Sequence, residues 1–469
     1  MVALGKLGVS GLVLAEGFRA LSDDDFARVT ISQRFAVTPA WDPTGSSWLP
    51  LPFWLQGATM ALLGRSLEVA RITSLVAGVA SALLVLVAAR WLGVPRWGAL
   101  LGAVLACAIP YAAWLGVATV PDGPTAALIL LGAVAAGCTD VTRRSVGAVA
   151  LLAATLCRYE AWPVAVLFTG VTALDAWRQR SSKLALAALV PTLGPVGWMV
   201  HGASNHGSAW FFVTRVTAYR EALGGEPSSA LGRAIEPPLA LLRCEPELAA
   251  VTGLALLCLL SVRQSPSFHS YRRPALLLAG LVAFLVAGQL RGSAPTHHDE
   301  RPLLAVWLGL AVFVGHALCW CWKSLGSRRR GLLVAAGVGL VGLGALVLRP
   351  RYGRLDPFVD RTWEVDIGRR AKTRIAAERE RVLIDTTDYG FYAVMAALGC
   401  PERATAFEMH DPRKPAPEGS WSSATALQHR LQAEHAAWFI IPTQRETLAR
   451  SIGRVRARNP RFVLLEYAP

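Results

Sequence analysis

Three consecutive acids follow the first apolar segment of the chain. Asp23, Asp24 and Asp25 lie directly behind residues 1–21, which are apolar enough to enter a membrane. Carboxylates at a membrane edge are costly to desolvate, so such a cluster needs either a partner or a task. Adjacent carboxylates raise one another's pKa, which suits a general base that works near neutral pH. The simpler explanation is a solvated cluster at a helix start, where the helix dipole favours acids.

Three further polar clusters could join these acids. Asp122, in the sequence VPDGP, begins a later apolar segment, and Arg158 and Glu160 interrupt a pair of such segments. The fourth cluster precedes a late apolar segment and consists of His297, His298, Asp299, Glu300 and Arg301. Arginine suits phosphate oxygens because its planar fork offers several donors and keeps its charge. Together the clusters could hold a phosphate and supply a carboxylate that accepts a proton.

Each of these clusters also has an ordinary structural explanation. Asp122 could cap a helix, and Arg158 and Glu160 could simply neutralise one another at membrane depth. The histidines could be solvated loop residues. Two adjacent histidines with two acids resemble metal ligands, but they lack a spacing such as HxxxH. We therefore predict no metal site from the sequence, and participation of a divalent ion is left open.

The composition is that of a polytopic membrane protein. Of the 469 residues, 53% are hydrophobic and only 17% are charged, and the mean hydropathy is +0.40. Soluble domains carry about 25% charged residues. A transmembrane helix needs about 20 apolar residues, and the sequence contains 11 candidate spans. They are residues 1–21, 68–92, 97–118, 122–138, 146–157, 160–174, 184–201, 247–262, 275–291, 303–322 and 331–348.

The placement of basic residues predicts the orientation of these spans. Five short loops rich in Arg and Lys fall on one side only if residues 146–174 cross the membrane twice. Basic short loops mark the cytoplasmic side, so we expect the N-terminus inside and the C-terminus outside. The four polar clusters then share the outer face, within an outer loop 22–67 and three later links. The net charge of +15 is thus mostly topogenic, which argues against nucleic-acid binding.

The composition changes after residue 348. Residues 349–380, rich in Arg, are interpreted as a connector. In residues 381–469, three apolar runs (381–385, 438–441 and 462–466) alternate with predicted helices at 390–398, 423–435 and 443–452. Such alternation predicts a small soluble α/β domain. Residues 1–348 would form the membrane domain.

Several short motifs resemble the membrane glycosyltransferases of the GT-C superfamily, in particular protein O-mannosyltransferases and aminoarabinose transferases. The resemblance lies in Asp23-Asp24-Asp25-Phe26-Ala27, Pro50-Leu51-Pro52-Phe53-Trp54-Leu55, Pro121-Asp122-Gly123-Pro124, Cys157-Arg158-Tyr159-Glu160 and Glu300-Arg301-Pro302-Leu303-Leu304. Many relatives have Asp-Glu where this chain has three Asp. The Asp-Asp-x-Phe register makes Asp24 the first choice for the base, and Asp122 resembles the second acidic position of the family.

The resemblance implies a multi-pass membrane enzyme of the cell envelope. Such an enzyme transfers a sugar from a polyprenyl-phosphate donor to an acceptor hydroxyl of a protein, lipid or glycan on the outer face, with inversion. One Asp would act as base, and Arg301, Arg158, Glu160, Glu300, His297 and His298 would hold the donor. The resemblance implies no certain cofactor. The alternative is a polytopic transporter or lipid flippase, which would also place charges within its spans.

Overall fold

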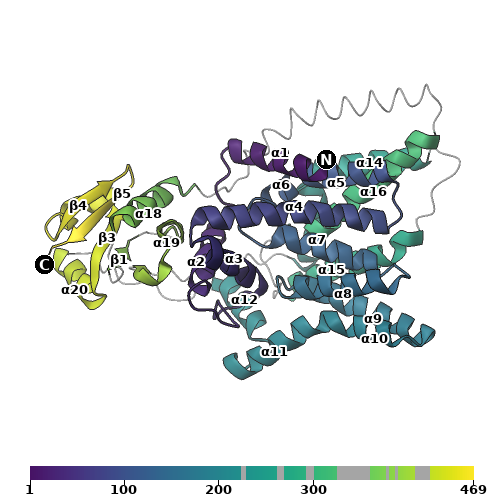
Figure 1. Cartoon of the computed structure of the whole chain (residues 1–469), viewed down its shortest axis with the longest axis horizontal. Helices are drawn as coiled ribbons and strands as arrows, with labels where there is room; N and C mark the ends of the chain where they lie inside the picture. Colours follow the sequence, from purple (N-terminus) through teal and green to yellow (C-terminus); the bar gives the residue numbers. More distant parts are fainter. Residues whose placement is uncertain are drawn as a thin grey trace.

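The computed structural model of the chain has two parts, a helical bundle and a small sheet with its own helices (Figure 1). The structure describes residues 1–222, 229–260, 269–291, 300–324, 360–375, 380–385, 389–406 and 423–468. The expected last span, 331–348, therefore lies outside the described residues.

The apolar segments of the sequence form helices, as their composition predicts. Within the described residues, four continuous helical stretches are long and apolar enough to cross a membrane: Leu67–Trp91, Ser182–His206, His269–Leu290 and Leu304–Ser324. Shorter apolar helices are α1 (Val2–Ala15), α3 (Leu51–Leu63), α5 (Arg96–Ala108), α7 (Asp122–Ala135) and α14 (Pro246–Leu260). The fold is thus a mostly helical polytopic one, and the number of 11 spans stays a prediction.

The named helices locate these stretches in Figure 1. The first long stretch is α4 (Leu67–Trp91), and Ser182–His206 comprises α10 (Ser182–Leu189), a 3-10 turn and α11 (Leu193–His206). The other two contain α15 (Arg272–Leu290) and α16 (Leu304–Ser324). The least regular segment, 146–174, forms two helices, α8 (Val141–Thr155) and α9 (Ala161–Gln179), which pack against each other. The charge pattern requires two crossings of the membrane in this segment; the structure has two helices there, and that both cross the membrane stays a prediction.

Small residues let the central helices approach closely. A Cβ atom on Gly315 of α16 would lie 2.3 Å from the backbone oxygen of Gly98 in α5, so neither a larger residue nor a wider crossing fits there. Close approach at small residues is the usual way in which helices associate in membranes. The bundle core around them includes the fully buried Trp114 and Trp307. Helix α7 begins at Asp122 and α16 begins three residues after Arg301, so the starts of both helices carry predicted site residues.

Helices that the sequence did not resolve cover the end of the bundle that faces the sheet. The loop 22–67 contains α2 (Asp23–Phe35) and α3, and the segment after α11 contains α12 (Phe211–Ala222) and α13 (Ala230–Arg243). A six-residue helix, α6 (Pro110–Leu115), continues α5 after a break at Pro110, as expected where proline removes a backbone donor. In Figure 1, α2, α3 and α12 lie between the bundle and the C-terminal sheet.

The C-terminal sheet has five strands in the order β2-β1-β3-β5-β4. Strands β1 (Arg381–Ile384), β2 (Ala404–Ala406) and β3 (Ala436–Pro442) are parallel, whereas β5 (Phe462–Tyr467) runs antiparallel to β3 and β4 (Gly453–Arg458). The three predicted apolar strands fall on β1, β3 and β5. Strand β4 was not predicted because its sequence GRVRAR is polar, which suits an exposed edge.

Four helices accompany this sheet. They are α18 (Thr362–Arg374), α19 (Phe391–Leu398), α20 (Ala424–Ala433) and the short α21 (Glu446–Ala449). The first of them, α18, lies inside the segment 349–380 that we expected to be a connector. It packs on α19 and against β5 and β4, so this part of the segment belongs to the C-terminal unit.

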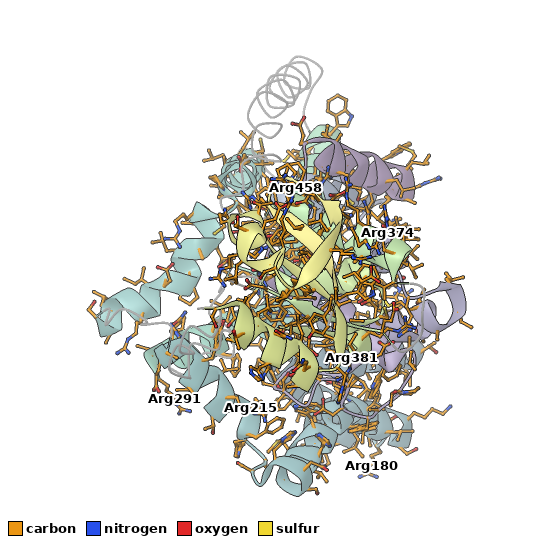
Figure 2. The ribbon with its side chains drawn as sticks, turned by 90° about the vertical axis from the view of Figure 1, so that its left-hand side faces the viewer. Arg180, Arg215, Arg291, Arg374, Arg381 and Arg458 are labelled. Atoms are coloured by element: carbon orange, nitrogen blue, oxygen red, sulfur yellow. The ribbon has the colours of Figure 1, made fainter. Side chains whose placement is uncertain are left out.

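The C-terminal unit docks on α2 through a shared apolar cluster. Phe26 and Val29 of α2 pack with Val365 of α18 and Ala396 of α19, and Gln33 Nε2 donates to the backbone oxygen of Ala396 over 2.9 Å. Figure 2 looks from the C-terminal side and shows the sheet in front of the middle of the bundle, with Arg381 and Arg458 on its strands and Arg374 at the end of α18. The acidic start of α2 therefore lies between the two parts.

Candidate functional site

The last acid of the triplet, Asp25, is a structural residue. It occupies the third position of a capping box with Ser22, whose backbone nitrogen donates to Asp25 Oδ2. Its other carboxylate oxygen, Oδ1, accepts hydrogen bonds from Thr119 N (3.0 Å) and Thr119 Oγ1 (3.3 Å). Burial raises the pKa of Asp25, while these hydrogen bonds and the charge of Arg301 oppose the rise. Asp25 thus matches the simpler explanation of the acids, a helix cap.

The first acid, Asp23, is bound by the C-terminal unit. Arg361, just before α18, donates from Nε to Asp23 Oδ1 (2.9 Å) and from Nη2 to Asp23 Oδ2 (2.8 Å). The remaining Nη1 of Arg361 donates to Glu364 over 3.0 Å. A two-pronged pair of this kind fixes both partners in orientation. Asp23 therefore ties the start of α2 to the sheet unit.

The middle acid, Asp24, has neither kind of partner. Within the described chain, no hydrogen bond and no ion pair reaches its carboxylate, which is half-buried. Its negative charge acts on Arg28 and Arg158 and on Tyr392 of α19. Of the three neighbouring carboxylates, Asp24 is thus the one without a hydrogen-bonded partner in the described part of the chain.

A second group of charges is buried close to Asp24. Asp122, the first residue of α7, is 2% exposed, and Arg158 Nη1 lies 3.0 Å from its Oδ1. Arg158 Nε also donates to Glu160. Pro121, not Asp122, is the N-cap of α7, and Asp122 makes no capping hydrogen bond. The Arg158–Glu160 pair is therefore part of a larger network, and helix capping does not explain Asp122.

Two more arginines complete this group. Arg301, which is 7% exposed, places Nη2 3.5 Å from Ser22 Oγ, and its charge acts on Asp25 and Asp122. Arg28 lies with its guanidinium 4.4 Å above the ring of Trp48, and burial lowers its pKa against the opposing charges of Asp24 and Asp122. We call Asp24, Arg28, Asp122, Arg158, Glu160 and Arg301 the site cluster.

An apolar pocket adjoins the site cluster. It has an empty volume of about 620 Å³ and is lined at one end by Arg28 and Pro121. Its walls come from α3, α4, the segment 115–124 and Cys157, and they include Phe53, Leu55 and Ala77. An apolar pocket with a few convergent polar groups is the usual form of a ligand site.

This architecture is shared with solved membrane glycosyltransferases. Over 99% of the chain it superposes on ArnT from Cupriavidus metallidurans bound to undecaprenyl phosphate, with a TM-score of 0.62, 15% identity and 97% of that chain covered. ArnT in the apo state gives 0.58 at 16% identity, with the same coverage of both chains. The chain has the GT-C fold.

A second GT-C protein is also similar. The oligosaccharyltransferase of Archaeoglobus fulgidus matches with a TM-score of 0.52 and 12% identity, over 95% of this chain and 69% of that one. No protein-family model matches the sequence, and no curated protein matches it by sequence. At these identities the likeness establishes the GT-C fold, and the residues must carry any statement about the reaction.

On this GT-C fold, five of the ten predicted site residues converge. Asp24, Asp122, Arg158, Glu160 and Arg301 lie in one group, although up to 277 positions separate them in sequence (301 − 24 = 277). The charge of Glu300, the neighbour of Arg301 in sequence, acts on Tyr111 and Cys244. His297 and His298 lie outside the described residues.

Two residues of this region were missed by sequence reasoning. Arg28 follows Asp24 by four positions in a helix, a spacing that brings side chains together and that could have identified it. Arg361 had no such signal, because it is one of many arginines in a segment taken for a connector.

Proposed function

We propose that the chain is a membrane glycosyltransferase that uses a polyprenyl-phosphate-linked sugar. In this reaction an acceptor hydroxyl oxygen attacks the anomeric carbon of the sugar, and the bond from that carbon to the phosphate oxygen breaks. The hydroxyl proton passes to Asp24, and the polyprenyl phosphate leaves. A single displacement inverts the anomeric centre. The acceptor is a hydroxyl of a protein, lipid or glycan.

The observation that carries the proposal is the unequal use of the three acids. Asp25 is bound by four donors and Asp23 by Arg361, so each has a structural task. Asp24 has none among the described residues, yet it lies beside buried arginines. A general base must be free to accept a proton, and it works best where neighbouring cations hold the substrate.

The arginines of the site cluster suit the leaving phosphate. Arg28, Arg158 and Arg301 converge on Asp122, and charge on a departing phosphate is stabilised by guanidinium groups that are already in place. The apolar pocket next to Arg28 offers a surface for the first units of the lipid chain. ArnT, which shares the fold, has been solved with undecaprenyl phosphate bound, which supports a donor of the same class.

We further propose that the site cluster and the C-terminal unit face the outside of the membrane. The basic loops of the sequence support this orientation. The loops on the inner side would then include the end of α9, which is followed by Arg180, and the start of α15 at Arg272. An impermeant thiol reagent that labels a cysteine placed at Arg180 from outside intact cells would overturn this orientation.

The decisive experiment compares transfer with transport. Purified protein in proteoliposomes is supplied with polyprenyl-phosphate sugars and an envelope extract as acceptor. The proposal predicts labelled sugar on an acceptor together with free polyprenyl phosphate in equal amounts. Movement of the lipid across the bilayer without transfer would identify a flippase instead.

A further inference from the structure

A second polar cluster lies outside the site cluster and involves residues that sequence reasoning did not identify. Asp42 comes from the loop between α2 and α3, and His201 and His206 come from the last turns of α11. Their nearest ligand atoms all lie within 4.8 Å of one another. Asp42 Oδ2 is 3.3 Å from His201 Nε2 and 3.6 Å from His206 Nε2. All three side chains are at least four-fifths buried.

These distances match the edges of a tetrahedral metal site. Zinc binds histidine nitrogen and carboxylate oxygen at about 2.0–2.2 Å. Two such ligands at a tetrahedral angle are then roughly 3.3–3.5 Å apart, from the same bond lengths. Two of the three separations between ligand atoms, 3.3 and 3.6 Å, are close to this value, and the third, between the two histidine nitrogens, is at most 4.8 Å. One ion therefore fits between the three side chains after a small movement of the rings. Two histidines, one carboxylate and an open fourth position are a common zinc set.

The residues around the cluster orient it as they do in metal sites. Asp42 Oδ1 accepts from Thr44 N, Thr44 Oγ1 and Gly45 N at 2.9, 2.9 and 3.0 Å. These bonds hold the other oxygen, Oδ2, toward the histidines. The side-chain amide of Asn205 lies 3.1 Å from His201 Nδ1, the ring nitrogen that faces away from Asp42. With its oxygen turned to this nitrogen, the amide accepts from Nδ1–H and leaves Nε2 free to bind a metal. Ligands whose second atoms are fixed by such partners are typical of protein metal sites.

A network of hydrogen bonds alone does not satisfy the cluster. His206 Nε2 is buried and has no hydrogen-bond partner within the described part of the chain. Its ring is held by stacking on Phe211, with 4.1 Å between the centroids, and so it stays aimed at Asp42. A buried polar atom without a partner is costly. A metal ion at this point would satisfy His206 and Asp42 together.

The geometry points to a binding site for a divalent transition metal of the Zn²⁺ class, with Asp42, His201 and His206 as ligands. The ion ties the loop before α3 to the end of α11. That loop also carries Ser47, whose backbone oxygen accepts from Tyr159 (2.5 Å), and Trp48, which covers Arg28. The metal therefore stabilises the loop that holds Trp48 against Arg28 of the site cluster, whatever reaction the site performs.

The test uses the full chain, purified in detergent with its affinity tag removed and stripped with EDTA. Calorimetric titration with ZnCl₂ alone should give one equivalent bound with micromolar or tighter affinity, and Zn²⁺ should raise the unfolding temperature. Asp42→Asn and His206→Gln should each lose this binding. Titration with Co²⁺ should give the visible spectrum of a tetrahedral site.

Two controls separate this site from other histidines. The double substitution His297→Gln and His298→Gln should leave the stoichiometry and affinity unchanged, as should His269→Gln, an exposed histidine remote in sequence. If the ligand variants fail to fold, Asn205→Ala should still weaken Zn²⁺ binding by about 10- to 100-fold, as loss of an orienting partner does. The inference would be overturned if Asp42→Asn, His206→Gln and Asn205→Ala all bound Zn²⁺ as wild type does. It would also be overturned if wild type showed no stoichiometric binding.

Discussion

Two buried groups of charges in the helical bundle differ in how fully they are paired. At one, Asp175 of α9 accepts from Arg273 Nη1 (2.6 Å) and Nη2 (2.9 Å) and from Arg144 Nη2 (3.0 Å). Arg144 also donates to Thr172 and to the backbone oxygen of Cys138. In the site cluster, by contrast, Asp122 Oδ1 lies 3.0 Å from Arg158 Nη1 as an ion pair. Within the described residues, however, neither oxygen of Asp122 has a well-aligned hydrogen bond, and neither has Arg28 Nε.

Under the proposed function, this difference is the one expected between a structural charge group and a substrate site. Buried polar atoms are nearly always hydrogen-bonded, and each exception needs an explanation. The Asp175 group joins α8, α9 and α15 and leaves its carboxylate saturated, so it holds helices together. The site cluster keeps donors and acceptors unused at the edge of a pocket, which is what a site needs before its substrate arrives. The same Asp→Asn substitution should therefore mainly reduce the transfer rate in the site cluster and mainly reduce stability in the Asp175 group.

Of the substitutions that compare the two charge groups, Asp122→Asn in the site cluster should have the largest effect. The substitution preserves size but removes the carboxylate on which three arginines converge, so the donor phosphate would meet them in the wrong arrangement. Transfer should fall about 100-fold or more, as for loss of a preorganised electrostatic group. The unfolding temperature in detergent should fall less than for Asp175→Asn, because Arg158 keeps Glu160 as a counter-charge. A normal transfer rate would show that Asp122 serves only structure.

The matching substitution Asp175→Asn should act on stability instead. It leaves Arg144 buried without its counter-charge, and breaking a buried pair costs about 3–5 kcal/mol. We expect the lower end, because Arg273 is 39% exposed and can reach water. Thermal unfolding in detergent measures the loss. The transfer rate per folded molecule should be unchanged, and a specific loss of rate at full stability would erase the contrast between the two groups.

A smaller effect is expected for Arg301→Lys. Lysine keeps the charge but lacks the planar fork that fits two phosphate oxygens. Loss of one charge-assisted hydrogen bond, worth about 1.5–3 kcal/mol, should slow transfer at least roughly tenfold, since 1.4 kcal/mol is a factor of ten. Steady-state kinetics with the donor varied will measure it. Unchanged kinetics for both Arg301→Lys and Arg301→Ala would remove this residue from the site.

The smallest effect is expected for substitution of Arg361, the residue of the C-terminal unit that binds Asp23. Arg361→Gln removes the two-pronged pair, whose side chains are 10% and 21% exposed, so the docking should weaken by about 1 kcal/mol. Hydrogen exchange in α18 and α19 should rise. Arg369→Gln is the matched control, because its pair with Glu68 is 54% exposed on both sides and contributes little. Equal exchange in both variants would mean that Asp23 does not anchor this unit.

Much of the fold follows from the sequence, because apolar segments of sufficient length have few alternatives to helices. The interpretation of 146–174 as two helices rested on charge placement alone, and the structure has two helices there. Strands β2 and β4 were missed for different reasons. Strand β2 has three residues, too few for a periodic pattern, and β4 is an arginine-rich edge.

The candidate site was predictable only where a residue type was unusual for its surroundings. Asp122, Arg158 and Arg301 stand out because charges are rare beside apolar segments. The partners of Asp23 and Asp42 do not stand out. Arg361 lies 338 positions from Asp23, and His201 lies 159 positions from Asp42, and no local pattern links such residues. Which of three adjacent acids is free depends on these distant partners, so the sequence could name Asp24 only through a resemblance.

The central claim is that Asp24, alone of the three acids, accepts the proton of the acceptor hydroxyl. Its most direct test measures sugar transfer by purified Asp23→Asn, Asp24→Asn and Asp25→Asn variants at equal amounts of folded protein. Loss of a general base costs about 100- to 10,000-fold, whereas loss of a helix-capping acid costs about 1 kcal/mol of stability and little rate. Asp24→Asn should therefore lose transfer while it keeps its unfolding temperature and binds donor, and the other two should lose stability first. Near-normal transfer by all three variants would contradict the assignment.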